Sequence, residues 1–261
     1  MQTTLENSVT FSGVGLHSGI LANLTLKPAP VNHGILFKRV DIVTGNPLVR
    51  ARWDYVSDTT LSTRLKNEDG TMVSTVEHLM AALAGCGVTN ALIELDTEEV
   101  PILDGSAALF VKGILEVGLN HISSSSRIIK IIKPVIFKNE FGWARLSPHK
   151  RPEMEYFIEF DDRAIGIQNK ILNMSNGSFV KELCSSRTFC SSKDVETMRE
   201  NGLALGGNYS NALVFEDDKV LSPGGMRHQD EAVRHKMLDA FGDLALAGAP
   251  ILGKYEGHKA G

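Results

Sequence analysis

The stretch His121-Ile-Ser-Ser-Ser-Ser-Arg127 divides the chain into two halves. It is a polar serine run between hydrophobic segments, a composition that is typical of a connection between domains. Strand-like and helix-like segments lie on both sides of it without strict strand–helix–strand alternation. This order predicts an α+β fold and argues against a doubly wound sheet. We expect one α+β domain at residues 1–122 and another at residues 127–261.

Hydrophobic periodicity predicts the elements of each half. Strands are expected at 21–26, 91–95, 128–137, 155–160 and 250–255, and helices at 75–84, 107–117, 180–183, 193–201 and 231–244. Two of these helices share the pattern H-x-M-x-x-x-x-G, starting at His78 and at His235. Chance explains three matched positions about as well as duplication does. A duplicated unit would place one histidine on a helix in each half.

Composition limits the classes of function. The 261 residues carry 27 Lys and Arg against 31 Asp and Glu, a net charge of −4, so no basic excess favours nucleic-acid binding. No apolar run approaches the roughly 20 residues of a membrane helix, and the first residues lack a secretory signal. Three irregularly spaced cysteines fit a reducing compartment. We expect a cytoplasmic protein, and the sequence indicates no protein partner.

The helix expected at 231–244 carries a polar stripe. His235, Asp239 and Asp243 follow one another at intervals of four residues, so they share one face of the helix. An imidazole followed one turn later by a carboxylate can bind a metal such as zinc. The alternative is an ordinary solvated face, on which Lys236 and the carboxylates form ion pairs.

A second candidate element is Ser74-Thr-Val-Glu77-His78. Ser74 and Glu77 have the spacing of a capping box, so Glu77 is first interpreted as a helix cap. Adjacent Glu and His also suit a zinc hydrolase, with the histidine as ligand and the glutamate as base. Together His78, His235 and Asp239 would form a three-ligand zinc set between the two halves, with a fourth position open as in catalytic sites.

Three further motifs are weaker. Gly13-Val-Gly-Leu-His-Ser-Gly19 lacks the strand–helix frame of a dinucleotide loop and predicts a turn. Asp104-Gly-Ser106 predicts a helix cap by either polar residue. The apolar small-residue segment 202–207 is either a turn or the wall of a narrow channel.

Seven motifs in order resemble one bacterial family, the UDP-3-O-acyl-N-acetylglucosamine deacetylases, which are zinc amidases of lipid A synthesis. They are SGVGLHSG (12–19), DTTL (58–61), STVEHL (74–79), VPILDGSA (100–107), SRTF (186–189), GLALGG (202–207) and VRHKMLDAFGDL (233–244). The resemblance runs from about residue 2 to the end of the chain. It implies two α+β domains of similar topology, each with helices packed against a sheet, and an active site between them.

The resemblance also implies a role for individual residues. It makes His78, His235 and Asp239 the ligands of one catalytic Zn²⁺. The implied catalytic residues are Glu77 as general base, Thr188 as an oxyanion-holding hydroxyl, Lys236 as a positive group near the substrate, and Asp243 as the partner of a proton-donating histidine. The implied substrate-binding residues include Leu61 and Ser62 at the mouth of the active site, and Lys236. They also include the residues of a hydrophobic passage for the acyl chain, which are Phe189, Val195, Ala204 and Gly207.

The implied reaction is hydrolysis of the acetamide of UDP-3-O-(3-hydroxyacyl)-N-acetylglucosamine, which releases acetate and is the committed step of lipid A biosynthesis. In the family the proton-donating histidine directly follows a glycine like Gly261, where this sequence stops. We therefore expect a C-terminally incomplete second domain and impaired turnover. The alternatives are a metal-binding pseudoenzyme that holds the UDP-glycolipid, and a fragment of a longer fused protein.

Overall fold

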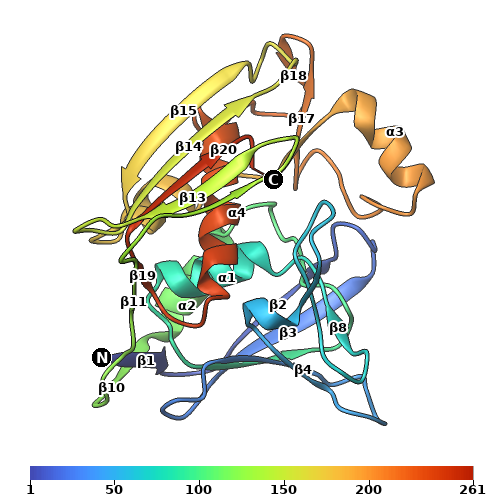
Figure 1. The fold of residues 1–261 in the computed structure, drawn as a ribbon. Helices are drawn as coiled ribbons and strands as arrows, with labels where there is room; N and C mark the ends of the chain where they lie inside the picture. Colours follow the sequence, from blue (N-terminus) through green and yellow to red (C-terminus); the bar gives the residue numbers. More distant parts are fainter. Residues whose placement is uncertain (261) are drawn as a thin grey trace.

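The first half of the chain forms a five-stranded mixed sheet (Figure 1). Its strands, in spatial order, are β2 (Val9–Val14), β3 (Leu21–Pro28), β9 (Ala91–Leu95), β4 (Ile35–Arg39) and β5 (Leu48–Arg50). β4 and β9 run parallel, and the other neighbours are antiparallel. Alternate residues of β3 are buried, as expected for a sheet with one face on the core. The computed structural model describes residues 1–260.

The second half forms another five-stranded sheet of the same plan. Its strands, in spatial order, are β12 (Val135–Lys138), β13 (Trp143–Ser147), β20 (Lys254–His258), β14 (Glu153–Glu159) and β15 (Ile167–Asn173). In both sheets the central strand comes last in the sequence, lies between two hairpins, and runs parallel to the first strand of one hairpin. The two halves therefore share a strand order, which adds weight to duplication over chance.

Four smaller sheets complete the strand structure. They are β1 (Gln2–Leu5) with β10 (Leu119–Ile122); β6 (Val56–Asp58) with β7 (Arg64–Lys66) and β8 (Met72–Val73); β11 (Ile129–Lys130) with β19 (Ile251–Leu252); and β16 (Phe189–Ser191) with β17 (Leu213–Glu216) and β18 (Lys219–Val220). The predicted connection lies between β10 and β11, although His121 and Ile122 belong to β10 itself. The α+β class is confirmed.

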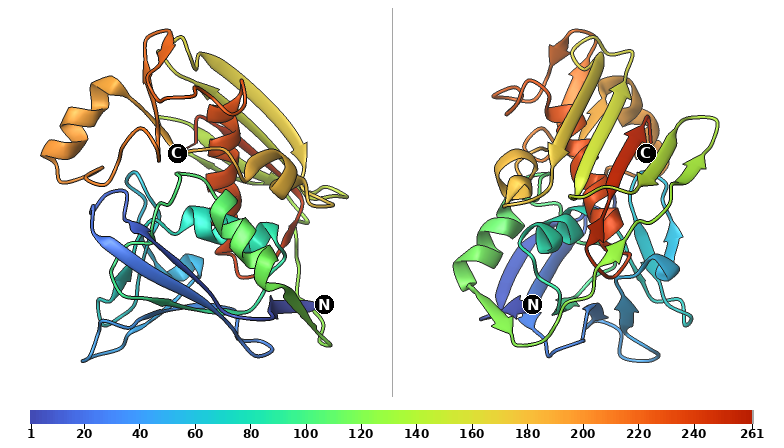
Figure 2. Two further views of the ribbon diagram at one scale, coloured as in Figure 1. Left: turned by 180° about the vertical axis from the view of Figure 1, so that it is seen from behind. Right: turned by 60° about the vertical axis from the view of Figure 1, so that its left-hand side comes forward.

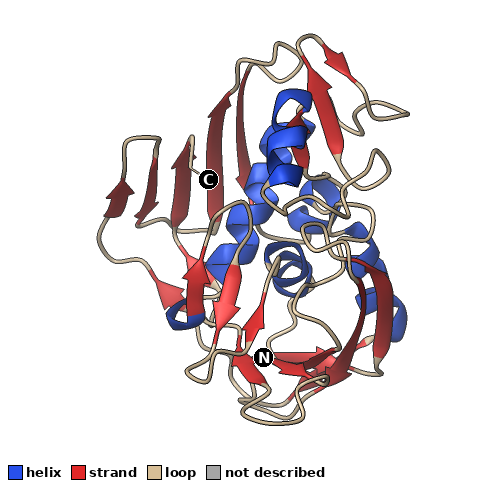
Figure 3. Cartoon of the chain, turned by 90° about the vertical axis from the view of Figure 1, so that its right-hand side faces the viewer, coloured by secondary structure: helices blue, strands red, loops and turns tan. Residues whose placement is uncertain are grey.

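Helices lie between the two large sheets, as Figures 2 and 3 show. The helices are α1 (Glu77–Gly85), α2 (Ala108–Val117), α3 (Ser192–Glu200) and α4 (Glu231–Ala245), with helical turns η1 (Trp53–Tyr55) and η2 (Phe179–Leu183). α1 packs against α4 and α2, whereas α3 projects from the second half. Within the described residues, no helix has the length and apolar character needed to cross a membrane.

The glycines of the shared H-x-M-x-x-x-x-G pattern permit close packing. A Cβ on Gly242 would overlap the carbonyl oxygen of Glu77, and it would lie 3.1 Å from Ala81 N. A Cβ on Gly85 would overlap the ring of Phe179. Any larger residue at either position would force its helix away from its neighbour. The backbone of α4 therefore lies directly on the first turn of α1.

Two predicted strands are broken in the structure. The strand expected at 128–137 is wrong as one piece, because Pro134 separates β11 from β12 and proline cannot donate to a ladder. The strand expected at 250–255 is likewise split into β19 and β20 at Gly253. A Cβ there would lie 2.7 Å from Ile131 Cγ1, so the backbone turns where another chain segment approaches it.

Candidate metal centre

Helices α1 and α4 bring two histidines together. His78 lies in the first turn of α1, and His235 lies in the second turn of α4. Their ring centroids are 5.0 Å apart, with the ring planes at 89°. The side chains are buried, with 4% of His78 and 3% of His235 exposed. The alternative of a solvated ion-pair face on α4 is therefore wrong at His235.

Asp239 adds a third potential ligand one turn after His235. Its Oδ1 atom lies 3.4 Å from His78 Nε2 and 3.3 Å from His235 Nε2. Ligand atoms from all three residues lie within 4.8 Å of one another. Ligands about 2.0–2.1 Å from a tetrahedral zinc ion would be about 3.3–3.4 Å apart. Asp239 Oδ1 is buried with no hydrogen-bond partner among residues 1–260, so the donor set fits a zinc ion.

The electrostatics of these three residues suit metal binding. Burial lowers the pKa of His235 to about 4, so its imidazole is neutral at neutral pH. Burial opposes ionisation of Asp239, but His235 and His78 outweigh it and hold the pKa of this carboxyl well below its usual range. Burial also disfavours protonated His78, but contact with Asp239 reverses this effect and raises its pKa. A bound cation would restore the neutral form of His78.

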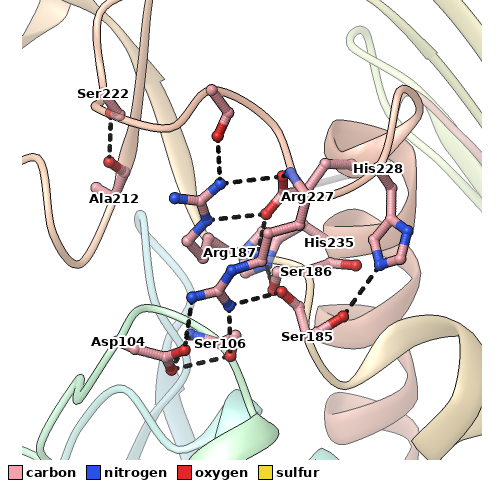
Figure 4. A network of polar contacts seen from close by, with 12 residues as sticks. Asp104, Ser106, Ser185, Ser186, Arg187, Ala212, Ser222, Arg227, His228 and His235 are labelled. Carbon is pink, nitrogen blue, oxygen red and sulfur yellow. Dashed lines mark hydrogen bonds and ion pairs between the residues drawn. The ribbon is translucent and has the colours of Figure 1, made fainter.

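The orientation of His235 is set by a backbone carbonyl. His235 Nδ1 lies 3.0 Å from the carbonyl oxygen of Ser186, in the segment that precedes β16 (Figure 4). A proton on Nδ1 satisfies this contact and leaves the lone pair of Nε2 facing Asp239 and His78. Metal-binding histidines commonly have such a partner on their second nitrogen.

Glu77 is buried beside the three ligands. Its Oε2 atom accepts a hydrogen bond of 3.1 Å from the backbone N–H of Thr63. Burial raises its pKa to about 8, and the carboxylates of Asp243 and Asp239 contribute in the same direction. The capping-box interpretation is wrong, because α1 has no side-chain cap and the backbone of Ser74 bonds instead to residues 98 and 100.

A cavity of about 190 Å³ opens beside the ligands. It is lined by Tyr156, Lys236, Asp239, Ala240, Asp243, Leu244 and Tyr255. Lys236 Nζ lies 3.8 Å from Asp239 Oδ2. Burial raises the pKa of Asp243 to about 6, although a hydrogen bond from Thr63 opposes that shift. The cavity thus places one cationic group, Lys236, and one further acidic group, Asp243, next to the candidate ligands.

Comparison with known proteins agrees with this geometry. The family described as UDP-3-O-acyl N-acetylglycosamine deacetylase (LpxC) matches residues 2–261. The chain belongs to the UDP-3-O-acyl N-acetylglycosamine deacetylase family. A relative named UDP-3-O-acyl-N-acetylglucosamine deacetylase from Idiomarina loihiensis is 45% identical over all of this chain and 85% of its own length. Proteins of the same name from Shewanella frigidimarina and Histophilus somni are 44% and 42% identical, with 85% and 86% of their lengths covered.

Two other residues expected from the deacetylase family lie in the segment that contacts His235. Thr188 follows Ser186 by two residues, and its N–H donates to the carbonyl of Gly105 at 2.8 Å. The ring of Phe189 packs edge-on against His235, with centroids 6.0 Å apart. The structure therefore groups the predicted ligands with Glu77, Lys236 and Asp243, and it brings the segment of Thr188 and Phe189 against them.

The remaining substrate residues expected for a deacetylase of this family lie farther out. Leu61 is exposed and precedes Ser62 in the loop between β6 and β7. Val195 lies on the projecting helix α3. Ala204 and Gly207 belong to a loop whose backbone bonds to residues 16 and 17, so the two glycine-rich motifs contact each other. No ligand contact tests these five positions, and they stay predictions.

Sequence reasoning missed two residues that organise this deacetylase-family site. Thr63 contacts both Glu77 and Asp243, and only its position directly after Leu61 and Ser62 could have drawn attention to it. Ser186 acts through its backbone carbonyl, for which its side-chain type gives no signal. Gly261, the residue before the expected proton donor, lies outside the described residues.

Proposed function

We propose that the chain catalyses zinc-dependent hydrolysis of the acetamide of UDP-3-O-(3-hydroxyacyl)-N-acetylglucosamine, releasing acetate, in lipid A biosynthesis. One observation carries the proposal: His78, His235 and Asp239 converge within 4.8 Å, next to the buried carboxylate of Glu77. Family membership and the names of the relatives support the choice of substrate.

Glu77 is the proposed general base. When bound, zinc supplies Lewis-acid chemistry that makes water acidic and polarises the acetamide carbonyl. Glu77, whose ionised form a bound cation would favour, takes a proton from the attacking water while the new carbon–oxygen bond forms. The carbon–nitrogen bond then breaks, acetate leaves, and the sugar amine receives a proton. The N–H of Thr63 holds the Glu77 carboxylate in one orientation during these steps.

Thr188, Lys236 and Asp243 complete the proposed machinery. The Thr188 hydroxyl donates to the oxygen that becomes negative as water adds, and one such preorganised donor is typically worth about 3–4 kcal/mol. Lys236 lines the cavity and supplies positive charge near this oxygen. Asp243, held by Thr63, orients the group that returns the proton to the amine. Substrate enters past Leu61 and Ser62.

The site belongs, in this proposal, to an interface between two domains at residues 1–122 and 127–261. The supporting observation is that each half has its own five-stranded sheet with the same strand order. The ligands come from both halves, His78 from α1 and the other two from α4. Helices α1 and α4 would then be equivalent elements of the two domains.

Acetate release from the acylated UDP-sugar by the zinc-loaded protein tests the proposal. We expect one deacetylated amine per acetate, detected by mass spectrometry, and loss of both after Glu77→Gln. The matched control is Glu116→Gln, an exposed glutamate on α2. Zinc binding with substrate binding but without acetate release would contradict the proposal and favour a glycolipid-binding protein.

A further inference from the structure

The segment 185–188 supplies two groups to the site. The carbonyl of Ser186 orients His235, and Thr188 carries the hydroxyl that the proposed function assigns to the developing oxyanion. A small shift of this segment would displace a metal ligand and an oxyanion donor together. What holds the segment in place therefore bears directly on catalysis, and the inference below rests on the proposed function.

The turn Asp104-Gly105-Ser106 of the first half meets this segment near both of its ends. Gly105 accepts a hydrogen bond from the N–H of Thr188 at 2.8 Å. At the other end, Arg227 Nη1 donates to the carbonyl of Ser185 at 2.9 Å, and its Nη2 pairs with Asp104 Oδ2 at 2.9 Å (Figure 4). One guanidinium thus joins the turn to the segment.

The turn has a defined internal structure. Asp104 Oδ1 accepts hydrogen bonds from the N–H of Ser106 at 3.2 Å and from its hydroxyl at 2.9 Å. Ser106 is fully buried. Gly105 has φ +82°, and a Cβ there would overlap the carbonyl oxygen of Asn211. The backbone of the turn therefore packs directly against the second half. It can therefore act as a fixed reference for the segment.

Arg227 also connects to the start of α4. Its backbone N–H donates to the carboxylate of Glu231, which is fully buried. The same carboxylate binds the guanidinium of Arg187 within the segment, at 3.0 Å from Nε. Glu231 lies one turn before His235 on α4. Movement of Arg227 would thus displace both segment 185–188 and α4, the helix that carries two of the ligands.

We propose that the Asp104–Arg227 ion pair holds segment 185–188 and α4 in fixed positions relative to the first half. The pair thereby positions Thr188 and His235 in the active site. The side chains of Arg227 and Asp104 are 36% and 22% exposed. An ion pair of this exposure contributes little to global stability. Its loss should therefore change catalysis and metal binding more than folding.

The test compares zinc-loaded wild type with Asp104→Asn, Arg227→Gln and the double variant. The Asp104→Asn substitution keeps the Oδ1 acceptor for Ser106 and replaces Oδ2 with an amide nitrogen that cannot pair with a guanidinium. We expect each single substitution to lower kcat about tenfold, because small misplacements of reacting groups cost large factors in rate, with KM changed less than about twofold. Zinc affinity, measured by competition with a chelating dye, should fall about tenfold, as for other groups that orient ligands.

The double variant and a control decide the interpretation. The double variant should be no worse than Arg227→Gln alone, because Asp104→Asn breaks only the ion pair and Arg227→Gln has already removed that pair together with the hydrogen bond to Ser185. Asp54→Asn removes an exposed Arg–Asp pair with Arg52 and should change none of these quantities. The proposal would be overturned if the effects of the two substitutions multiplied in the double variant. It would also be overturned if the single variants kept the kcat and the zinc affinity of wild type. Failure of wild type to release acetate, with the zinc affinities as expected, would overturn the proposed reaction and leave the positioning role supported.

Discussion

Thr63 Oγ1 donates a hydrogen bond of 2.7 Å to Asp243 Oδ1. The two residues lie 180 positions apart in the sequence, in opposite halves of the chain. The backbone N–H of Thr63 also binds Glu77. One threonine therefore contacts both carboxylates that are proposed to handle protons, and it holds them at a fixed separation.

Replacing Thr63 with valine should lower deacetylation about tenfold with little change in KM. Valine keeps the shape and the N–H to Glu77 but removes the hydroxyl, so Asp243 loses the hydrogen bond that fixes its orientation. Steady-state kinetics of Thr63→Val and Thr63→Ser measure the effect. The serine variant should recover most of the rate, and equal loss in both variants would show that the hydroxyl alone does not account for the role of Thr63.

Gly242→Ala should destabilise the protein by about 1–3 kcal/mol, as overpacking does. Helix propensity alone would predict the opposite sign, since alanine is favoured over glycine by about 1 kcal/mol. The new methyl group would overlap the Glu77 carbonyl, so steric repulsion outweighs propensity. Urea unfolding measures the change. Gly207→Ala, where the nearest atoms are 3.2 Å or more from the added Cβ, is the control.

Zinc should stabilise the folded chain through His78, His235 and Asp239. A ligand that binds only the folded state adds stability that grows with its concentration, about 2.7 kcal/mol at 100 times the Kd. The melting temperature should therefore rise with added zinc and fall with a chelator. In the double variant His78→Ala with His235→Ala, neither treatment should shift the melting temperature, and bound zinc measured by elemental analysis should be absent. Retention of one equivalent of zinc would contradict this ligand set.

Acid should weaken the second sheet through Glu256. Hydrogen bonds from Arg145, at 2.8 and 2.7 Å, lower the pKa of this carboxyl below its ordinary 4.5. Its stabilising contribution is therefore complete above pH about 5 and is lost as the pH falls through the lowered value. The difference in unfolding free energy between wild type and Glu256→Gln should be larger at pH 7 than at pH 3. A difference independent of pH would refute this linkage.

The site was predictable where local geometry controls it. The four-residue spacing places His235 and Asp239 on one helical face, and the structure keeps them there. The contact between α1 and α4 was inferred only indirectly, from the three-ligand zinc set that His78, His235 and Asp239 would complete, because periodicity does not show which helices pack together. Ser74 was misinterpreted as a cap because its backbone instead forms an isolated bridge with Glu99, a contact between residues far apart in the sequence. Thr63 and Ser186 were missed for the same reason: their roles arise from tertiary contacts.

The absence of a side chain at Gly242 has a consequence for the affinity of the ion. Sliding α4 by one residue along its axis would move Asp239 by about 1.5 Å, enough to separate it from His78. The contact of Gly242 with the Glu77 carbonyl opposes such sliding before any ion arrives. The donor atoms are thus preorganised, and little ordering entropy remains to be lost on metal binding. Selectivity among divalent cations then rests on how well each tolerates this fixed spacing.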